Sequence, residues 1–291
     1  MPRVSIGLTV FNSERYLEES IQSLLAQTFE DFELIISDNA STDRTKEIAL
    51  AYAARDSRVR FVRNRMNIGV AGNFNQAFRL SSGEFFKWAA YDDLCARDFL
   101  FRCVEVLDRD PDVVLAYPRT VGIDEHGRAT VSHAPGPDLT SPDPAIRFAH
   151  IMRAPFWATS LFGLIRAEVM AKTGLMPSNA AGDHVLLAEL SLHGRFSEIP
   201  GEGFFNRDHP GRAFTKSSII TRAQQVDPRL GRNPFVLRLT QIGSYLSVIR
   251  RAPLDRRARL RCNRAVARWL GDRMAARGAT QRLERLRDLH L

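Results

Sequence analysis

Apolar residues in the first part of the chain alternate between runs typical of buried strands and stripes at helical spacing. The runs are Val4–Val10, Phe32–Ser37, Val59–Val62, Glu84–Tyr91 and Val113–Tyr117. The stripes are Leu17, Ile21, Leu24 and Leu25; Phe74, Ala77 and Phe78; and Leu100, Cys103, Val104 and Leu107. A further helix is expected after the second run, capped by Ser41 or Thr42. Strands that alternate with helices need crossover connections, so the sequence predicts an α/β fold with a mostly parallel, twisted sheet flanked by helices.

The alternation is less regular beyond Tyr117. A turn at 124–127 and a surface loop at Ser132–Pro144, rich in Pro, Ser and Gly and typical of a mobile lid, come first. The remaining expected elements are a strand at Thr159–Ile165, a helix opened by Asp183 and ended at Gly194, and a closing strand pair at Phe196–Ile199 and Phe204–Arg207. From Pro228 onward the pattern is helical and rich in arginine, which predicts a helical appendage.

The net charge of +8 is concentrated in the last third of the chain, where arginines cluster. This excess favours an anionic partner, such as a phosphate-bearing substrate or an acidic membrane surface. The tail lacks interleaved aromatic residues and any recognised nucleic-acid motif, so we expect no nucleic-acid partner. Three cysteines without a C-x-x-C pair argue against structural zinc and for a reducing compartment. No apolar stretch is long enough for a bilayer span and the first residues enter a strand at once, so we expect a cytoplasmic protein.

Polar residues stand where several predicted strands end. Asp92 and Asp93 follow the fourth strand, Asn12 follows the first, and Asp38 follows the second. The carboxyl ends of parallel strands meet at one edge of a sheet, where ligands bind in open α/β folds. Paired carboxylates there suit a hard divalent cation that bridges to a substrate phosphate, which indicates Mg²⁺ or Mn²⁺. A histidine ligand would favour Mn²⁺.

The order of these motifs resembles the inverting family-two glycosyltransferases of the GT-A fold, over about Val4 to His209. The resemblance rests on Thr9-Val10-Phe11-Asn12 with Glu14, Ser37–Asp43, Asn67-Ile68-Gly69, Ser82–Phe85, Tyr91-Asp92-Asp93, Gly182-Asp183-His184 and Arg207-Asp208-His209. It implies a catalytic domain over 1–225, with a Rossmann-like nucleotide-sugar half at about 1–118 and an acceptor half at about 119–225. Residues 226–291 would form the basic helical extension.

The resemblance also implies a role for each motif. The nucleotide-sugar donor would be bound by Thr9, Phe11, Asn12, Glu14, Asp38, Asn67, Gly69, Asp92 and Arg207. Asp38 would read the base, because a carboxylate can accept the ring N–H of uracil, thymine or guanine. Asp93 would hold the metal together with Asp92, and Asp183 would take the proton of the acceptor hydroxyl. His209 could be a further metal ligand or could hydrogen-bond the diphosphate. Trp157 is the candidate contact to the acceptor, a glycan or a lipid-linked glycan.

Each candidate also has a purely structural interpretation. Asp38 could form an Asx turn, Asp183 a helix cap, and Arg207 and His209 a polar turn before a proline. The whole domain could bind a nucleotide sugar without turning it over, as a scaffold or regulator. The tail could lie on an anionic membrane at the inner face through Leu254, Leu260, Val266, Trp269 and Leu270. Alternatively, these residues pack on the catalytic domain or on a second subunit of a homodimer.

Overall fold

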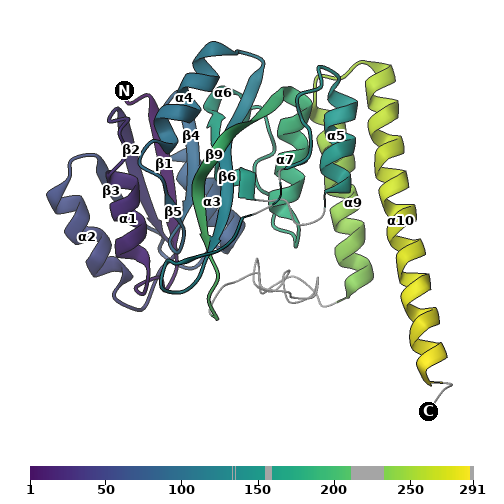
Figure 1. Ribbon diagram of the computed structural model, residues 1–291, viewed down its shortest axis with the longest axis horizontal. Helices are drawn as coiled ribbons and strands as arrows, with labels where there is room; N and C mark the ends of the chain where they lie inside the picture. Colours follow the sequence, from purple (N-terminus) through teal and green to yellow (C-terminus); the bar gives the residue numbers. More distant parts are fainter. Residues whose placement is uncertain (133, 135, 155–158, 211–232, 289–291) are drawn as a thin grey trace.

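The computed structural model describes residues 1–132, 134, 136–154, 159–210 and 233–288, with side chains in the last helix described as far as Arg273. The strands are β1 (Val4–Val10), β2 (Phe32–Asp38), β3 (Val59–Arg63), β4 (Phe85–Ala90), β5 (Leu94–Cys95), β6 (Val113–Ile123), β7 (Ala129–Ser132), β8 (Leu164–Arg166) and β9 (Arg195–Arg207). They form one sheet in the order β3-β2-β1-β4-β8-β6-β9-β5, and β7 pairs with β6 (Figure 1).

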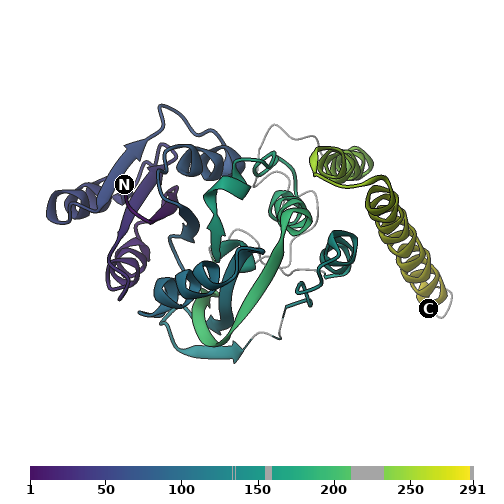
Figure 2. The same ribbon diagram turned by 90° about the horizontal axis from the view of Figure 1, so that it is seen from above.

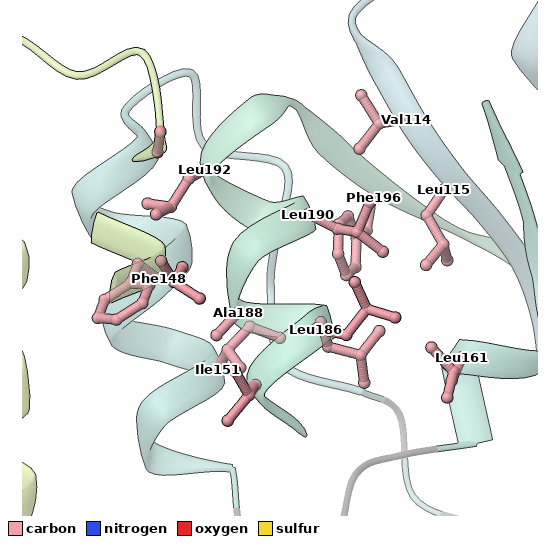
Figure 3. Close-up of a cluster of buried hydrophobic side chains, with 14 of the residues drawn as sticks. Val114, Leu115, Phe148, Ile151, Leu161, Leu186, Ala188, Leu190, Leu192 and Phe196 are labelled. Carbon is pink, nitrogen blue, oxygen red and sulfur yellow. The ribbon is translucent and has the colours of Figure 1, made fainter. Parts of the chain in front are cut away.

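Helices cover both faces of this sheet, and the last two helices of the chain lie beyond these layers (Figures 1 and 2). The helices are α1 (Leu17–Leu25), α2 (Thr45–Arg55), α3 (Val70–Arg79), α4 (Phe99–Arg109), α5 (Pro144–Arg153), η1 (Thr159–Phe162), α6 (Ala167–Met170), α7 (Gly182–His193), α9 (Pro234–Arg251) and α10 (Arg256–Asp288). Helices α1, α2 and α4 share one apolar core with the sheet, while α3, α5 and α7 share the other. Figure 3 shows part of the second core, where Leu186 and Leu190 of α7 lie among side chains of the sheet and of α5.

The first four strands in the sheet order run parallel, as the sequence predicts. β1 pairs with β2 so that Val10 lies opposite Asp38, and with β4 so that Thr9 lies opposite Ala90. The three strands therefore end side by side, which brings the loops after Val10, Asp38 and Ala90 to one edge. This confirms the expected α/β class with a mostly parallel sheet and a helical C-terminal region.

The second half of the sheet departs from the prediction in two elements. The expected strand at Thr159–Ile165 is a 3₁₀ turn, η1, followed by the short strand β8, which runs antiparallel between β4 and β6. The expected closing strand pair is a single strand, β9, which passes through Pro200 and Gly201 with irregular register against β6. Pro200 and Gly201 form a bulge without partners in β6, with Gly201 at φ 88°, and the pairing resumes at Glu202.

Helices α9 and α10 continue the fold beyond α5 and α7 (Figures 1 and 2). Helix α9 starts with Asn233, whose side chain accepts the backbone N–H of Phe235, and with Pro234 in its first turn. Of the apolar residues considered for membrane contact, Leu254, Val266 and Trp269 are buried in the core shared with α5 and α7, whereas Leu260 is exposed. None of the described helices is long and apolar enough to cross a membrane.

A bidentate ion pair fixes the end of α9 to α7. The Glu189 carboxylate is completely buried and accepts from Arg251 Nε at 2.9 Å and Nη2 at 3.0 Å. One of its oxygens also accepts the backbone N–H of Gly174 at 3.0 Å. Without the guanidinium this carboxylate would lose its countercharge inside the core, so the pair holds α9 onto α7.

Removing this arginine should therefore destabilise the whole protein. We expect Arg251→Ala to lower the free energy of unfolding by about 2–3 kcal/mol, because Glu189 keeps its charge and loses its partner. Arg250→Ala, at the exposed neighbouring position, should change it by less than about 0.5 kcal/mol. Urea unfolding followed by circular dichroism measures both variants. Equal stability of the two variants would contradict the assignment.

Candidate functional site

Asp38 ends β2 at the edge where the parallel strands finish, and it is completely buried. Its Oδ1 accepts two hydrogen bonds from Ser41, one from the backbone N–H at 2.9 Å and one from the hydroxyl. Its Oδ2 accepts no hydrogen bond within the described residues, and the nearest cation is Arg63 Nε at 3.5 Å. One oxygen thus shapes the loop, as in an Asx turn, and the other remains available as an acceptor.

The loop after β1 is tied to the loop after β2. Asn12, in a left-handed conformation with φ 50°, accepts the backbone N–H of Thr42 at 2.8 Å, and Glu14 accepts that of Arg44 at 3.0 Å. The side chains of Asn12 and Glu14 therefore hold the loop after β2 in place. Helix α2 begins at Thr45 with no side-chain cap, so the expected cap by Ser41 or Thr42 is wrong. The hydroxyl of Ser41 is already bonded to Asp38.

An amide network holds the loop at Asn67-Ile68-Gly69 against β2. Asn39 donates to Asn67 Oδ1 at 2.8 Å and accepts the backbone N–H of Ile68 at 2.9 Å. Gly69, with φ 80°, precedes α3, and its N–H is bonded to the Asn67 side chain. Buried Asn73 joins Ser37 to Asn64 in the same network. Asn67 and Gly69 thus lie next to the Asp38 loop, as the motif predicts, whereas the network that holds them was not predicted.

Asp92 lies at the end of β4 and meets His209, the second residue after β9. Asp92 Oδ2 lies 3.0 Å from His209 Nε2, and both residues are buried. A carboxylate only accepts, so Nε2 carries the proton and is not free to ligate a metal in this arrangement. The His209 ring packs on Tyr16 with 4.9 Å between ring centroids.

Asp93 is bonded to the last residues of β9. Its Oδ1 accepts from Asn206 Nδ2 at 3.0 Å and from the backbone N–H of Arg207 at 2.9 Å. The short strand β5 follows at once and pairs antiparallel with β9, so the acidic turn is fixed on both sides. The structure therefore brings Asp92, Asp93 and His209 together at one edge, although His209 lies more than a hundred residues beyond the acidic pair.

Arg207 occupies the centre of this cluster and is completely buried. Its guanidinium donates to the Asp92 carbonyl at 2.9 Å, to the Glu125 carbonyl at 3.2 Å and to Glu19 at 2.7 Å. It also lies over the Tyr16 ring, 4.6 Å from the centroid. With its donors directed at these groups, Arg207 holds β4, β9, α1 and the 124–127 turn together. We therefore interpret it as a positioning residue instead of the phosphate ligand expected from the sequence.

The carboxylates at this edge are chemically suited to a hard cation. Burial raises the pKa of Tyr91 to about 12, and the neighbouring negative charges of Asp92 and Asp93 act in the same direction. Within the described residues no three His, Cys, Asp or Glu side chains form a preformed metal cluster. Mg²⁺ needs only one or two carboxylates when substrate phosphates and water complete its shell, so Asp92 and Asp93 fit such an ion.

Asp183 lies in the first turn of α7, which begins one residue earlier, at Gly182. The prediction that Asp183 is the cap residue is therefore wrong by two positions, since the cap position is Ala181 and has no side-chain hydrogen bond. Asp183 Oδ1 accepts the backbone N–H of His184 at 2.7 Å. Trp157, the candidate acceptor contact, lies outside the described residues. Phe11 is exposed at the same edge as Asp38, and Thr9 is buried in β1.

Sequence reasoning missed several residues that build this site. They are Tyr16, Glu19, Asn39, Asn73 and Asn206. Asn39 is adjacent to Asp38 and Asn206 to Arg207, so their positions in the sequence could have indicated a role at the site. Tyr16 immediately precedes α1, and Glu19 and Asn73 lie on helices, where an exposed or core position was an equally good explanation.

The chain belongs to glycosyl transferase family 2, whose sequence model matches residues 5–167. Among curated relatives, the putative glycosyltransferase EpsE of Bacillus subtilis is 39% identical over 94 residues, which is 32% of this chain and 34% of EpsE. Chondroitin synthase of Escherichia coli is 32% identical over 127 residues, 44% of this chain and 18% of the synthase. The alignments thus cover between about a third and under half of the first curated relatives' own length.

Solved structures show the same fold. TarS 1-349 of S. aureus, in complex with UDP-GlcNAc, matches with a TM-score of 0.70 at 18% identity, over 92% of this chain and 71% of that one. The mannosyltransferase PcManGT of Pyrobaculum calidifontis, in complex with GDP-Man and Mn²⁺, matches with a TM-score of 0.54 at 19% identity, over 97% and 81%. The GT-A fold is therefore established for this chain.

Two arginines on the Tyr16 ring allow a matched test of the cluster. Arg207 and Arg15 both lie over this ring and both pair with a glutamate, but Arg15 is mostly exposed. We expect Arg207→Met to lower the free energy of unfolding by about 3 kcal/mol, because several buried acceptors lose their donor. Arg15→Met should cost less than about 1 kcal/mol. Chemical denaturation measures both, and a similar loss for the two variants would refute the structural role of Arg207.

Proposed function

We propose that this protein transfers a sugar from a nucleoside diphosphate sugar to an acceptor hydroxyl, with inversion at the anomeric carbon and assistance from a divalent metal. The observation that carries the proposal is the arrangement of Asp38 and the Asp92–Asp93 pair at the ends of β2 and β4, the two parallel strands that flank β1. The acceptor class we infer is a glycan or lipid-linked glycan of polysaccharide or cell-envelope synthesis, in line with the names of the relatives.

Asp38 is the proposed reader of the nucleotide base. Its buried Oδ2 accepts no hydrogen bond within the described residues and would gain one from a ring N–H of the donor. Uracil, thymine and guanine carry such a ring donor, whereas adenine and cytosine do not. The two structural neighbours were solved with a uridine and a guanosine donor, which agrees with this choice. Exposed Phe11 is well placed to cover the base at the same edge.

Asp183 is the proposed general base. Its carboxylate would accept the proton of the acceptor hydroxyl while that oxygen forms a bond to the anomeric carbon. The bond from this carbon to the diphosphate oxygen breaks at the same time, so the nucleoside diphosphate leaves with the electron pair and the configuration inverts. Because Asp183 already accepts one hydrogen bond through Oδ1, Oδ2 is the oxygen proposed to take the proton.

Asp92 and Asp93 would hold the metal, and His209 would orient Asp92 through the proton on Nε2. A bound Mg²⁺ or Mn²⁺ supplies positive charge for the departing diphosphate. Asn206 and the backbone of Arg207 keep Asp93 in place without neutralising it, since both are uncharged donors. Glu19 balances the buried Arg207 charge, which leaves the carboxylate pair as the negative centre of the edge.

We expect Asp38→Asn to weaken donor-nucleotide binding by about 1.5–3 kcal/mol, because an amide N–H would then face the ring N–H of the base. Isothermal titration with UDP, GDP, ADP and CDP measures the effect. The wild type should prefer UDP or GDP, and the variant should lose this preference. Asp56→Asn, a change of the same chemistry beyond α2, should bind like wild type. Equal binding of ADP and UDP by the wild type would refute the proposed base reading.

We expect Asp93→Asn to lower turnover about 100-fold or more, because the metal site loses one of its two charges. The fold should persist, since the amide oxygen can still accept from Asn206 and Arg207. Thermal shift with UDP-GlcNAc or GDP-mannose, with and without Mn²⁺, measures binding apart from turnover. Stabilisation that needs Mn²⁺ in the wild type and disappears in the variant is expected. Donor binding and turnover that survive EDTA would show that no metal is used.

A further inference from the structure

Three side chains connect helix α9 to the first turn of α7, next to Asp183. The Tyr245 hydroxyl lies 2.8 Å from His184 Nδ1. His184 Nε2 lies 3.1 Å from the carbonyl oxygen of Ala154, at the end of α5. Gln241, one turn before Tyr245, donates from Nε2 to the Tyr245 hydroxyl at 3.4 Å.

The donor and the acceptor of each hydrogen bond in this series follow from the groups at its two ends. The Ala154 carbonyl can only accept, so His184 Nε2 carries a proton. Burial lowers the pKa of His184, and the charge of Arg273 acts in the same direction, against the opposing charge of Asp183. In the neutral ring Nδ1 is then an acceptor, so the Tyr245 hydroxyl donates to it. The Gln241 amide nitrogen can only donate to the same hydroxyl, which agrees with this assignment.

Tyr245 is completely buried, and the neighbouring side chains fix the position of its ring. Its ring packs edge-on against Phe148 of α5 and Trp269 of α10, with centroid distances of 6.5 and 5.6 Å. Burial also raises the pKa of Tyr245, so the hydroxyl keeps its proton. The side chain therefore acts as a rigid hydrogen-bond donor that three helices hold in place.

A second contact from α9 reaches the segment just before α7. Ser244 accepts from Asn179 Nδ2 at 3.0 Å, and Asn179 Oδ1 accepts the backbone N–H of Ala181 at 2.9 Å. The helix itself has no side-chain cap at Ala181. The first turn of α7 is thus fixed by neighbouring residues of α9. Asp183 accepts the backbone N–H of His184, and the ring of the same His184 is bonded to Tyr245.

We propose that Tyr245 is a positioning residue for sugar transfer, which acts through His184 to fix the carboxylate of Asp183. The inference rests on the proposed function, in which Asp183 is the general base. Tyr245 lies on α9, outside the residues 5–167 that the family model matches. The proposal thus gives a residue of the C-terminal helices a role in supporting the active site. The contribution is to geometry alone, since the buried Tyr245 hydroxyl is bonded to His184 and Gln241.

The test compares two tyrosines that differ in their link to Asp183. Tyr245→Phe removes one hydroxyl and keeps the packed ring. Tyr52→Phe is the matched control, because Tyr52 on α2 also accepts from a glutamine, Gln22 Nε2, at 3.0 Å. Turnover is measured as nucleoside diphosphate release from UDP-GlcNAc and GDP-mannose, with short alkyl glycosides and with water as acceptors. Asp183→Asn is measured beside them.

We expect Tyr245→Phe to lower kcat about tenfold, the factor that 1.4 kcal/mol of lost positioning produces, with the Kd of the donor unchanged within twofold. Tyr52→Phe should keep the kcat of the wild type. The double variant His184→Gln/Tyr245→Phe should be no slower than His184→Gln alone, because Tyr245 acts through that ring. If Tyr245→Phe turns over like wild type while Asp183→Asn is inactive, the positioning role is wrong and the proposed base stands. If Asp183→Asn transfers normally, the proposed base itself is wrong.

A spectroscopic measurement tests the geometry without any turnover. The ¹⁵N shifts of the His184 ring, assigned by comparison with His184→Gln, should show a neutral ring protonated on Nε2 at pH 7. Tyr245→Phe should shift the Nδ1 resonance, because this nitrogen loses its donor, and Tyr52→Phe should leave it in place. A charged ring, or a proton on Nδ1 in the wild type, would overturn the proposal.

Discussion

The buried guanidinium of Arg207 is the interaction on which the candidate site depends. A charge that is completely removed from water must be met by acceptors in fixed directions, and here they come from three separate parts of the chain, Glu19, Asp92 and the 124–127 turn. Because the Asp92 carbonyl and the backbone N–H that Asp93 accepts both belong to this cluster, the acidic pair cannot shift without breaking it. Arginine suits this role better than lysine, since its planar fork can serve several acceptors at once.

The parallel part of the site was predictable because its geometry is local to each strand. Once β1, β2 and β4 are recognised as parallel, Asn12, Asp38 and Asp92 must lie at one edge, and the structure places them there. The roles of their atoms were not predictable. That Ser41 takes one oxygen of Asp38, and that His209 meets Asp92 through a protonated nitrogen, depends on loop conformations that no periodicity describes.

The errors beyond Tyr117 have physical causes. Pro200 and Gly201 indicate a turn in isolation, but they form only a bulge within β9, because the pairing with β6 continues on both sides of them. Helix α5 was missed, although Asp143 and Pro144 form a regular helix start and Phe148, Ile151 and Met152 face the core. The loop-like composition before Pro144 concealed that signal. The C-terminal helices, expected as an extension, are joined to α7 through Glu189 and His184 by contacts that only the folded chain reveals.

The long sequence separation within the acidic edge has a consequence for how the protein is made. During synthesis the four parallel strands, all before Tyr91, can pair as soon as they leave the ribosome. The backbone N–H that Asp93 accepts, however, belongs to Arg207, which lies 114 residues further along the chain. A nascent chain that stops short of β9 therefore has the parallel strands and the acidic pair, but it lacks Asn206, Arg207 and His209, which hold that pair in place. The acidic edge is thus completed late, when most of the polypeptide has already been translated.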